Sequence, residues 1–460
     1  MGFRVFGHNR RFGIMLGLLS GNLPSFYVAT TGNDTTGNGS SAAPWKTITK
    51  AIATVPDIAC NVFVAAGTYA ENTSGLNYLF ITRNFTYPVT LRASGSVTIT
   101  DNGSVTYCVR ISTGANLRFD GFTIEPSGTN NQGTIAVFAG AALDLANCVV
   151  KTVNQCVFCN VTGAATIRLA GCSLVARVGA PATIRGCFLR AGNGGNITAV
   201  LSNCVMTMVS AVASSAGIDA ALTHAAGLLS LTISGGSYSN TGGYCVFADG
   251  ASVSISNATI QSVSAPALVL GEDTAGTYTT TGSVENCTIS CVSSHACLIG
   301  GMCNGVAVTG NHITGGDHGL VFKECDNCFA VGNTLIGGTL SAAYFKAAVG
   351  CSIISNVIDG AAAAIVLLAL NADTGNKSQN CTLTDNFITP HGAADCLLWN
   401  DATQDAGGGV CDRNVYDISD TTGDIGTVRA TANIGDLLTL QGAWSGYDVS
   451  GNDANSTVIP

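Results

Sequence analysis

The chain has 460 residues with 57 Gly, 9 Pro, 10% charged and 47% hydrophobic residues, and its formal net charge is -9. This composition excludes a disordered chain, which needs high charge and low hydrophobicity. Because no Lys/Arg-rich stripe is present, binding to a nucleic-acid backbone is not expected. A neutral or weakly charged partner such as a glycan fits better, and the Ser, Thr, Asn and Gly content favours strands and tight turns.

Residues 1–25 form a candidate segment of their own. Basic residues precede an apolar stretch at 12–19, a pattern typical of a weak secretory signal. No small-x-small cleavage site follows, so we expect an anchoring segment that docks onto another protein, with a signal-like segment as the alternative. No run reaches the roughly 18 apolar residues that span a bilayer. The longest, AAAAIVLLAL at 361–370, predicts a strand buried on both faces.

The next segment predicts a strand at 26–29, a loop rich in Gly, Asn and Ser, and an amphipathic helix with Trp45, Ile48 and Ile52 on one face. A further strand is expected to end at residues 67–69, which read Gly-Thr-Tyr. Because the open end of a stack of parallel strands would pair with other chains, we expect the helix to cap that end.

A repeated pattern, apolar-x-Gly/Asn-x-x-apolar, fills the middle of the chain. Its matches include FDGFTI (119–124), LANCVV (145–150), LAGCSL (169–174), LSNCVM (201–206), ISGGSY (233–238), ISNATI (255–260), VENCTI (284–289), VTGNHI (308–313), AVGNTL (330–335), IISNVI (353–358), LTDNFI (383–388) and CDRNVY (411–416). Successive matches are 22–32 residues apart. This period predicts an all-β fold, a right-handed parallel β-helix that is a single-stranded solenoid of about 12 coils. IRGCFL (184–189) also matches, but it lies too close to its neighbours for a coil of its own.

The fourth position of the pattern predicts a ladder through the stacked coils. It holds Cys148, Cys172, Cys204 and Cys287, and then Asn311, Asn333, Asn356, Asn386 and Asn414. Asn tolerates left-handed backbone and its amide can bond to the next coil, whereas a buried Cys behaves as a small hydrophobe. We therefore expect most of the 19 cysteines to be free thiols. The pairs at 156/159 and 325/328 are interpreted as packing, because no second matching pair completes a zinc site.

Both ends of the chain resemble a known family. The segments PWKTITKA (44–51) and GTY (67–69) resemble elements of the N-terminal cap of the pectate-lyase-like right-handed β-helix superfamily. NVYD (414–417) and the segment at 437–460 resemble the tail of its secreted polysaccharide lyases. The resemblance covers residues 26–460 and implies the fold. It leaves the function open, because this superfamily also includes non-catalytic members and phage tailspikes.

Four regions follow from these patterns. They are an anchoring segment (1–25), an N-terminal cap with the first coils (26–110), the parallel β-helix repeats (111–417) and a C-terminal cap or tail (418–460).

One part of the repeats carries candidate chemistry. The segments HACLI and HGLVF occupy the same place in adjacent coils, so His295 and His318 are expected to stack at the start of a strand. Lys323 and Glu324 follow, and Lys346 lies near the matching turn of the next coil. Two stacked His with Lys could perform general acid–base work. We therefore assign His318, Lys323 and Glu324 as candidate catalytic residues, with surface turn residues as the alternative.

A second set of residues is expected to bind carbohydrate. It consists of His295, Asp317, Asp326, Trp399 and Asp401. An aromatic ring beside amides and carboxylates suits a sugar, although Trp399 packing inside a terminal coil is an equal alternative. The carboxylates could also form the acid pair of a glycosidase, which needs two carboxyls ~5–9 Å apart.

The resemblance implies two kinds of enzyme. Its lyases use a Lys or Arg base and often a calcium ion, and its hydrolases use Asp clusters with a Gly-His-Gly turn. GGDHG (315–319) loosely resembles that turn, but the other hydrolase elements are absent. No cluster of three carboxylates marks a calcium site, so no metal or cofactor is expected.

Two functional classes remain. The first is a virion appendage, such as a phage tailspike, fibre or head-decoration protein. It would be a homotrimer that docks on other virion proteins through residues 1–25 and contacts a host cell-surface polysaccharide. The second is a secreted bacterial polysaccharide lyase or glycoside hydrolase. The low charge and the many thiols, typical of assembly in a reducing cytoplasm, favour the virion class.

Overall fold

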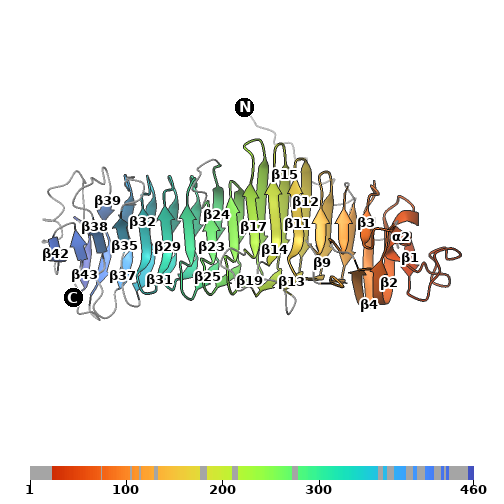
Figure 1. The fold of residues 1–460 in the computed structure, drawn as a ribbon. Helices are drawn as coiled ribbons and strands as arrows, with labels where there is room; N and C mark the ends of the chain where they lie inside the picture. Colours follow the sequence, from red (N-terminus) through yellow and green to blue (C-terminus); the bar gives the residue numbers. More distant parts are fainter. Residues whose placement is uncertain are drawn as a thin grey trace, which may run out of the picture.

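The computed structural model is a right-handed parallel β-helix whose coils stack into a rod, from the red N-terminal end to the blue C-terminal end in Figure 1. It describes residues 23–73, 75–103, 106–112, 116–128, 133–176, 184–209, 216–271, 278–360, 366–369, 378–389, 397–400, 410–418, 426–428, 431–434 and 454–459. Most coils contribute three strands, which form three faces of the rod.

Strands of the first and second faces together make a 28-stranded sheet, and those of the third face make a 15-stranded sheet. The first face contains β1 (Ser25–Val28), β2 (Cys60–Glu71), β4 (Val89–Asp101), β6 (Leu117–Asp120), β9 (Ala142–Ala146), β12 (Ala164–Ala170), β15 (Asn196–Ser202), β18 (Leu228–Ser234), β21 (Ser252–Ser256), β24 (Thr281–Glu285), β27 (Ala307–Thr309), β30 (Phe329–Val331), β33 (Ser352–Ile354), β36 (Thr382–Thr384) and β39 (Val410–Asp412). The second face contains β7 (Thr123–Ile124), β10 (Val149–Thr152), β13 (Ser173–Ala176), β16 (Val205–Met208), β19 (Ser237–Asn240), β22 (Thr259–Ser262), β25 (Thr288–Cys291), β28 (His312–Thr314), β31 (Thr334–Gly337), β34 (Val357–Gly360), β37 (Phe387–Thr389), β40 (Val415–Asp417) and β43 (Thr457–Ile459). The third face contains β3 (Leu79–Ile81), β5 (Val109–Ile111), β8 (Ile135–Val137), β11 (Gln155–Val161), β14 (Arg185–Ala191), β17 (Ile218–Leu222), β20 (Val246–Asp249), β23 (Leu268–Leu270), β26 (Cys297–Gly300), β29 (His318–Lys323), β32 (Ser341–Lys346), β35 (Val366–Ala369), β38 (Leu397–Asn400), β41 (Gly426–Val428) and β42 (Thr431–Ile434).

The fold class predicted from the repeats is confirmed, and the predicted number of coils is only approximate. All of the strand pairs of the described residues are parallel except β41 with β42. The segment at 184–189 belongs to β14 on the third face, so it does not begin a coil, as its spacing indicates. Of the predicted apolar strand at 361–370, the described part is β35.

The corner between the first and second faces explains the Gly/Asn position of the repeat. Residues with a positive φ there include Asn147, Gly171, Asn203, Gly235, Asn257, Asn286, Gly310, Gly332, Ser355, Asp385 and Arg413. Our expectation that the ladder Asn adopts the left-handed backbone is therefore wrong by one residue. The left-handed residue precedes the ladder position, because the chain must turn before it can aim the next side chain into the core.

The amide ladder itself forms as predicted. The backbone N–H of Asn311 donates to Oδ1 of Asn333 (2.8 Å), and Nδ2 of Asn311 donates to the same oxygen (2.9 Å) and to the carbonyl of Val284 (2.9 Å). The arrangement repeats through Asn356 and continues to Asn414, whose N–H donates to Ser456 Oγ. Each amide thus joins three coils inside the core.

The cysteines described by the structure are all buried and carry free thiols, as the ladder predicts. Thiols of the ladder donate to backbone carbonyls, as Cys204 Sγ does to Leu169 O (3.4 Å). Burial raises the pKa of Cys159 to about 12 and disfavours its reactive thiolate form. Buried cysteines such as Cys159 therefore pack as small hydrophobes.

The N-terminal helix α2 (Ile48–Thr54) lies at the end of the rod against β1, β2 and β3. Its apolar side is buried, but Trp45 is not on it, because the helix begins at Ile48 after the cap residue Thr47. Trp45 is itself buried and bridges to Val28. The strand after the helix, β2, was expected to end at residues 67–69, but it continues to Glu71, with an irregular register at Gly67.

Among the described residues, no helix has the length and hydropathy that a membrane span requires. At the C-terminal end, β43 pairs in parallel with β40 and extends the second face. The segment at 437–453, on which part of the family resemblance rests, lies outside the described residues. So does most of the predicted anchoring segment, 1–22.

Candidate functional site

Outward-facing apolar side chains on the third face form the floor of a groove. In β26, β29 and β32, alternate residues face inward and outward, and Leu298, Val321 and Tyr344 are register partners on the outer side. Leu298 is only 5% exposed and Val321 only 2%, although they lie outside the core of the rod. Neighbouring side chains must therefore rise above them as walls.

One wall contains two histidine rings, which lie before β26 and at the start of β29. The ring centroids of His295 and His318 are 4.9 Å apart, and those of His318 and Tyr344 are 5.1 Å apart. Nδ1 of His318 lies 2.5 Å from Oγ of Ser341, its register partner in the next coil. This hydrogen bond and the two ring contacts fix the orientation of the His318 imidazole.

The opposite wall carries two lysines. Lys323 and Lys346 end β29 and β32 and are register partners, so their backbones are ~4.8 Å apart. Neither lysine forms an ion pair with another described residue. Two like charges side by side repel, and an anion between them would relieve that repulsion.

The groove extends toward the N-terminal end of the rod past Pro266 to Tyr244, and its volume is about 460 Å³. Tyr244 stacks on Phe247, with centroids 5.8 Å apart, and both rings pack against the floor. We call this site the third-face groove. Its lining consists of Tyr244, Pro266, Ser294, His295, Leu298, His318, Val321, Lys323, Tyr344 and Lys346.

The two histidines of the groove are neutral at pH 7. Burial and, to a smaller extent, the neighbouring His295 lower the pKa of His318 to about 4, although Asp317 opposes the shift. Burial also lowers the pKa of His295, with smaller contributions from Lys323 and Lys346. The positive charge of the groove therefore comes from the two lysines, and the histidines offer neutral hydrogen-bonding groups.

Three of the predicted site residues meet in this groove. His295, His318 and Lys323 line it, and the stacking of the two histidines is confirmed. Asp317 lies beside the groove without lining it. Its Oδ1 accepts a hydrogen bond from Thr339 Oγ1 (3.2 Å), and its charge opposes the lowering of the pKa of both histidines.

The two acidic residues after Lys323 lie elsewhere. Glu324 adopts a left-handed backbone with φ 54°, which turns the chain away from the third face immediately after β29. Asp326 lies in the following turn, is exposed, and bridges to Asn304 and Val349 of the adjacent coils. Neither of them lines the groove.

The structure describes no side chain for the other two predicted carbohydrate-binding residues. Asp401 lies outside the described residues. Trp399 belongs to β38, where its backbone pairs with Leu368 and Val428, and only this backbone position is described.

The floor and the far end of the groove were not predicted. Leu298, Val321, Tyr344 and Tyr244 carry no group that is charged at neutral pH, so the sequence does not mark them as candidate site residues. The sequence does contain a sign of this floor, because strands such as LVF at 320–322 are apolar at consecutive positions. A strand that is apolar on both faces indicates that its outer face is also covered.

Among the described residues, those that line the groove are cationic, aromatic, aliphatic or neutral polar. None of the described residues that line it carries a carboxylate. A glycosidase needs a pair of carboxyl groups flanking the bond to be broken, so the groove lacks the side chains for glycoside hydrolysis. Its chemistry suits recognition of a negatively charged ligand.

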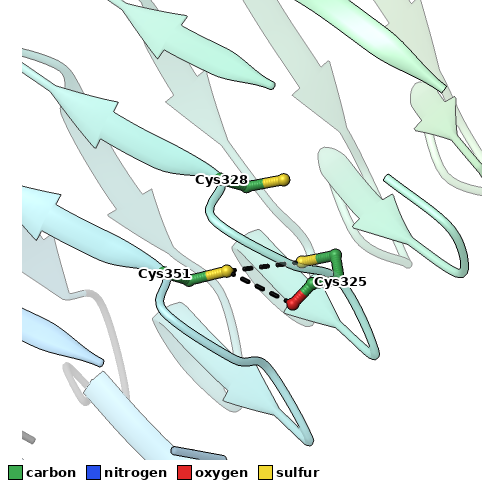
Figure 2. Close-up of side chains that lie close together, drawn as sticks. All are labelled: Cys325, Cys328 and Cys351. Atoms are coloured by element: carbon green, nitrogen blue, oxygen red, sulfur yellow. Dashed lines mark hydrogen bonds between the residues drawn. The ribbon is translucent and has the colours of Figure 1, made fainter. Parts of the chain in front are cut away.

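A separate cluster lies in the interior of the rod. The Sγ atoms of Cys325, Cys328 and Cys351 all lie within 4.8 Å of one another (Figure 2). Among the described residues, these three thiols form the one group of at least three His, Cys, Asp or Glu side chains close enough together to hold a metal ion. They do not line the groove.

Comparison with known families supports the fold. A sequence model described as "Right handed beta helix region" matches residues 244–405, which include the third-face groove. Another, described as "Protein of unknown function (DUF1565)", matches residues 30–86 at the N-terminal end. No curated protein matches the chain in sequence.

Several solved structures resemble the chain at low identity. Tailspike protein 3 of bacteriophage CBA120 is 14% identical over 94% of this chain with a TM-score of 0.45, and the chain spans 62% of its length. The Dettilon tailspike protein is 11% identical over 88% of this chain and 68% of its own, with a TM-score of 0.35. The GH136 lacto-N-biosidase from Eubacterium ramulus is 10% identical over 97% of this chain and 68% of its own, with a TM-score of 0.31. These likenesses concern the fold alone.

Proposed function

We propose that this chain, which folds as a right-handed parallel β-helix, binds an acidic glycan in the third-face groove. We further propose that it does so as a virion appendage that contacts polysaccharide on a host cell surface. The observation that carries the proposal is the pairing of Lys323 with Lys346 above an apolar floor without a carboxylate.

Each part of the groove has a counterpart in an acidic sugar. The apolar faces of pyranose rings pack on aromatic and aliphatic surfaces such as Tyr344 and Leu298. A carboxylate between Lys323 and Lys346 forms charge-assisted hydrogen bonds, which are about twice as strong as neutral ones. The neutral His295 and His318 suit hydroxyl groups. The positive charge of Lys323 and Lys346 in the groove thus favours an acidic glycan, although the net charge of the chain is -9.

The virion role has two supports in the chain. Its charged fraction is only 10%, which suits a rod whose outer faces are partly covered by other subunits. Its described thiols are free, as expected of a protein assembled in a reducing cytoplasm. The appendage would be a homotrimer that docks on other virion proteins through residues 1–25.

Two measurements test this proposal. The full chain is titrated by calorimetry with uronate-containing, sialylated and neutral oligosaccharides, and we expect heat of binding from acidic members only. Binding of neutral sugars alone, or of none, would contradict the glycan assignment. Sedimentation equilibrium tests the assembly, and a monomer at micromolar concentration would contradict the appendage role.

A polysaccharide lyase is the second candidate, because a lysine pair beside a neutral imidazole also suits β-elimination from a uronate. One lysine would neutralise the carboxylate while the neutral imidazole of His318 removes the proton next to it. The glycosidic C–O bond then breaks to leave a C=C double bond, and the leaving oxygen takes a proton from the other lysine or from water. This favours a lyase over a hydrolase in the alternative of a secreted enzyme. Incubation with acidic polysaccharides, followed by the absorbance of unsaturated uronate, tests it. Binding without any such product would leave the protein as a glycan-binding appendage.

A further inference from the structure

Three buried thiols from two adjacent coils meet at one corner of the fold. Cys325 and Cys328 flank the turn between β29 and β30, and Cys351 comes from the same corner of the next coil (Figure 2). The Sγ atoms of Cys325 and Cys351 are 3.7 Å apart, and all three side chains are at most 1% exposed. No other described group of three ligating side chains converges in this way.

The turn geometry produces this convergence. Glu324 and Asn327 both adopt a left-handed backbone, with φ 54° and 52°, so the chain turns sharply just before each cysteine and points both thiols inward. Because β30 and β33 pair in parallel register, Cys328 stacks against Cys351 one residue before the paired strands. The spacing of the pair at 325 and 328 alone does not reveal the third ligand, which comes from the neighbouring coil.

Packing alone does not require three thiols here. One coil later, the position of Cys325 is occupied by Ala348, and one coil earlier the position of Cys328 is occupied by Val306. Both of these residues are fully buried. Alanine and valine therefore fill equivalent places in the same stack.

The distances fit a three-coordinate metal ion. A metal–sulfur bond of ~2.3 Å gives S···S separations of about 4.0 Å in a planar triangle. This value lies between the Cys325–Cys351 separation of 3.7 Å and the upper limit of 4.8 Å for the trio. Zinc almost always takes four ligands in structural sites, whereas soft thiolates also select Cu(I), which accepts three.

We propose that Cys325, Cys328 and Cys351 form a trigonal thiolate site for one Cu(I) ion. Binding forms three copper–sulfur bonds and releases up to three thiol protons to solvent, without transfer of electrons. The site would join two coils independently of the third-face groove.

The neighbouring coils provide substitutions that the fold accepts. Cys325→Ala introduces the side chain found at Ala348, and Cys328→Val introduces the one found at Val306. Each removes one ligand without leaving a polar group unpaired. The matched control is Cys287→Asn, which removes a buried thiol elsewhere and continues the amide ladder of Asn311.

Cu(I) alone is added anaerobically to the reduced full chain during refolding, because the trio is closed to solvent in the folded state. Binding is measured by competition with a copper chelator, and the ligand shell by X-ray absorption. We expect one tight equivalent with three sulfur atoms at ~2.3 Å. Loss of a residue that merely supports a ligand costs about 10–100-fold. Cys325→Ala and Cys328→Val should therefore lower the affinity by more than about 100-fold, and Cys287→Asn should not change it.

Three outcomes would overturn the proposal. They are the absence of a tight first equivalent in the wild-type chain, equal affinity in the control and the two ligand variants, and a sulfur count other than three. Circular dichroism of each refolded variant shows whether the β-helix has formed. If one ligand variant does not fold, the other still decides between these outcomes.

Discussion

The imidazole rings of His295 and His318 lie 4.9 Å apart on adjacent coils, and the second ring also stacks on Tyr344. This relationship arises because parallel strands in register repeat the same position every coil. Residues that are 23 positions apart in sequence thereby become neighbours along the rod. Lys323 and Lys346, at the ends of β29 and β32, are paired by the same register. The repeated positions of successive coils thereby form the two walls of the groove.

Removing one lysine should weaken the binding of acidic glycans. A hydrogen bond to a charged group contributes roughly 1.5 kcal/mol, so Lys323→Ala and Lys346→Ala are each expected to lower affinity about tenfold. Calorimetry at low and high salt measures the effect, which should shrink as screening increases. Lys46→Ala changes an exposed lysine near the N-terminal helix and should leave affinity unchanged. Equal losses in all three variants would indicate a general charge effect.

Acid should destabilise the protein through His318. The unfolded imidazole has a pKa near 6.5 and the folded one a pKa of about 4, so the unfolded state binds more protons between these values. Stability is therefore complete above pH ~6.5 and declines as the pH falls toward 4, by at most about 3 kcal/mol for this group.

The measurement is urea unfolding of the wild type and of His318→Asn at pH 7 and pH 5. The pH dependence should be smaller in the variant, whatever its stability at pH 7. His224→Asn is the control, because this histidine is exposed. An unchanged pH dependence in His318→Asn would show that other groups cause the acid sensitivity.

Breaking the amide ladder should destabilise the middle of the rod. Asn333→Ala removes the oxygen that accepts from both the backbone N–H and Nδ2 of Asn311, leaving buried donors unpaired. The expected cost is about 2–4 kcal/mol, measured by chemical denaturation. Asn304→Ala alters an exposed amide in the same region and should change stability by less than about 0.5 kcal/mol. Similar costs for both variants would refute a special role for the ladder.

Glu71 should stabilise the N-terminal helix. Its carboxylate accepts from the backbone N–H groups of Ile48 (2.8 Å) and Thr49 (2.9 Å), at the positive end of the helix dipole. We expect Glu71→Ala to lower the free energy of unfolding by about 2 kcal/mol, with faster amide exchange in the helix. Glu125→Ala breaks a partly exposed ion pair with Lys151 and should cost no more than about 1 kcal/mol. Unchanged exchange in Glu71→Ala would contradict the capping role.

The sequence predicts the coils well because each coil carries the same pattern of apolar and turn residues. The buried amide at Asn311 and the stacked histidines both follow from aligning one rung with the next. The helix is placed less accurately, since Trp45 fits its apolar periodicity although the chain becomes helical only after Thr47. Periodicity records which side chains are buried, but it does not distinguish a helix from the extended segment that precedes it.

The candidate site is only partly predictable for a related reason. A charged residue such as Lys323 can be identified from the sequence as a candidate site residue, whereas Val321 and Tyr344 resemble ordinary strand residues. Glu324 was assigned to the same site because it is adjacent in sequence, yet its left-handed backbone ends the strand. The register of neighbouring coils, rather than proximity in sequence, determines which side chains share the groove.

The location of a bound sugar tests the central claim most directly. The measurement is a crystal structure of the full chain with the acidic oligosaccharide that it binds most tightly. Our account predicts sugar rings over Leu298 and Tyr344, with a carboxylate between Lys323 and Lys346. A sugar bound to another face of the rod, with the third-face groove empty, would contradict it.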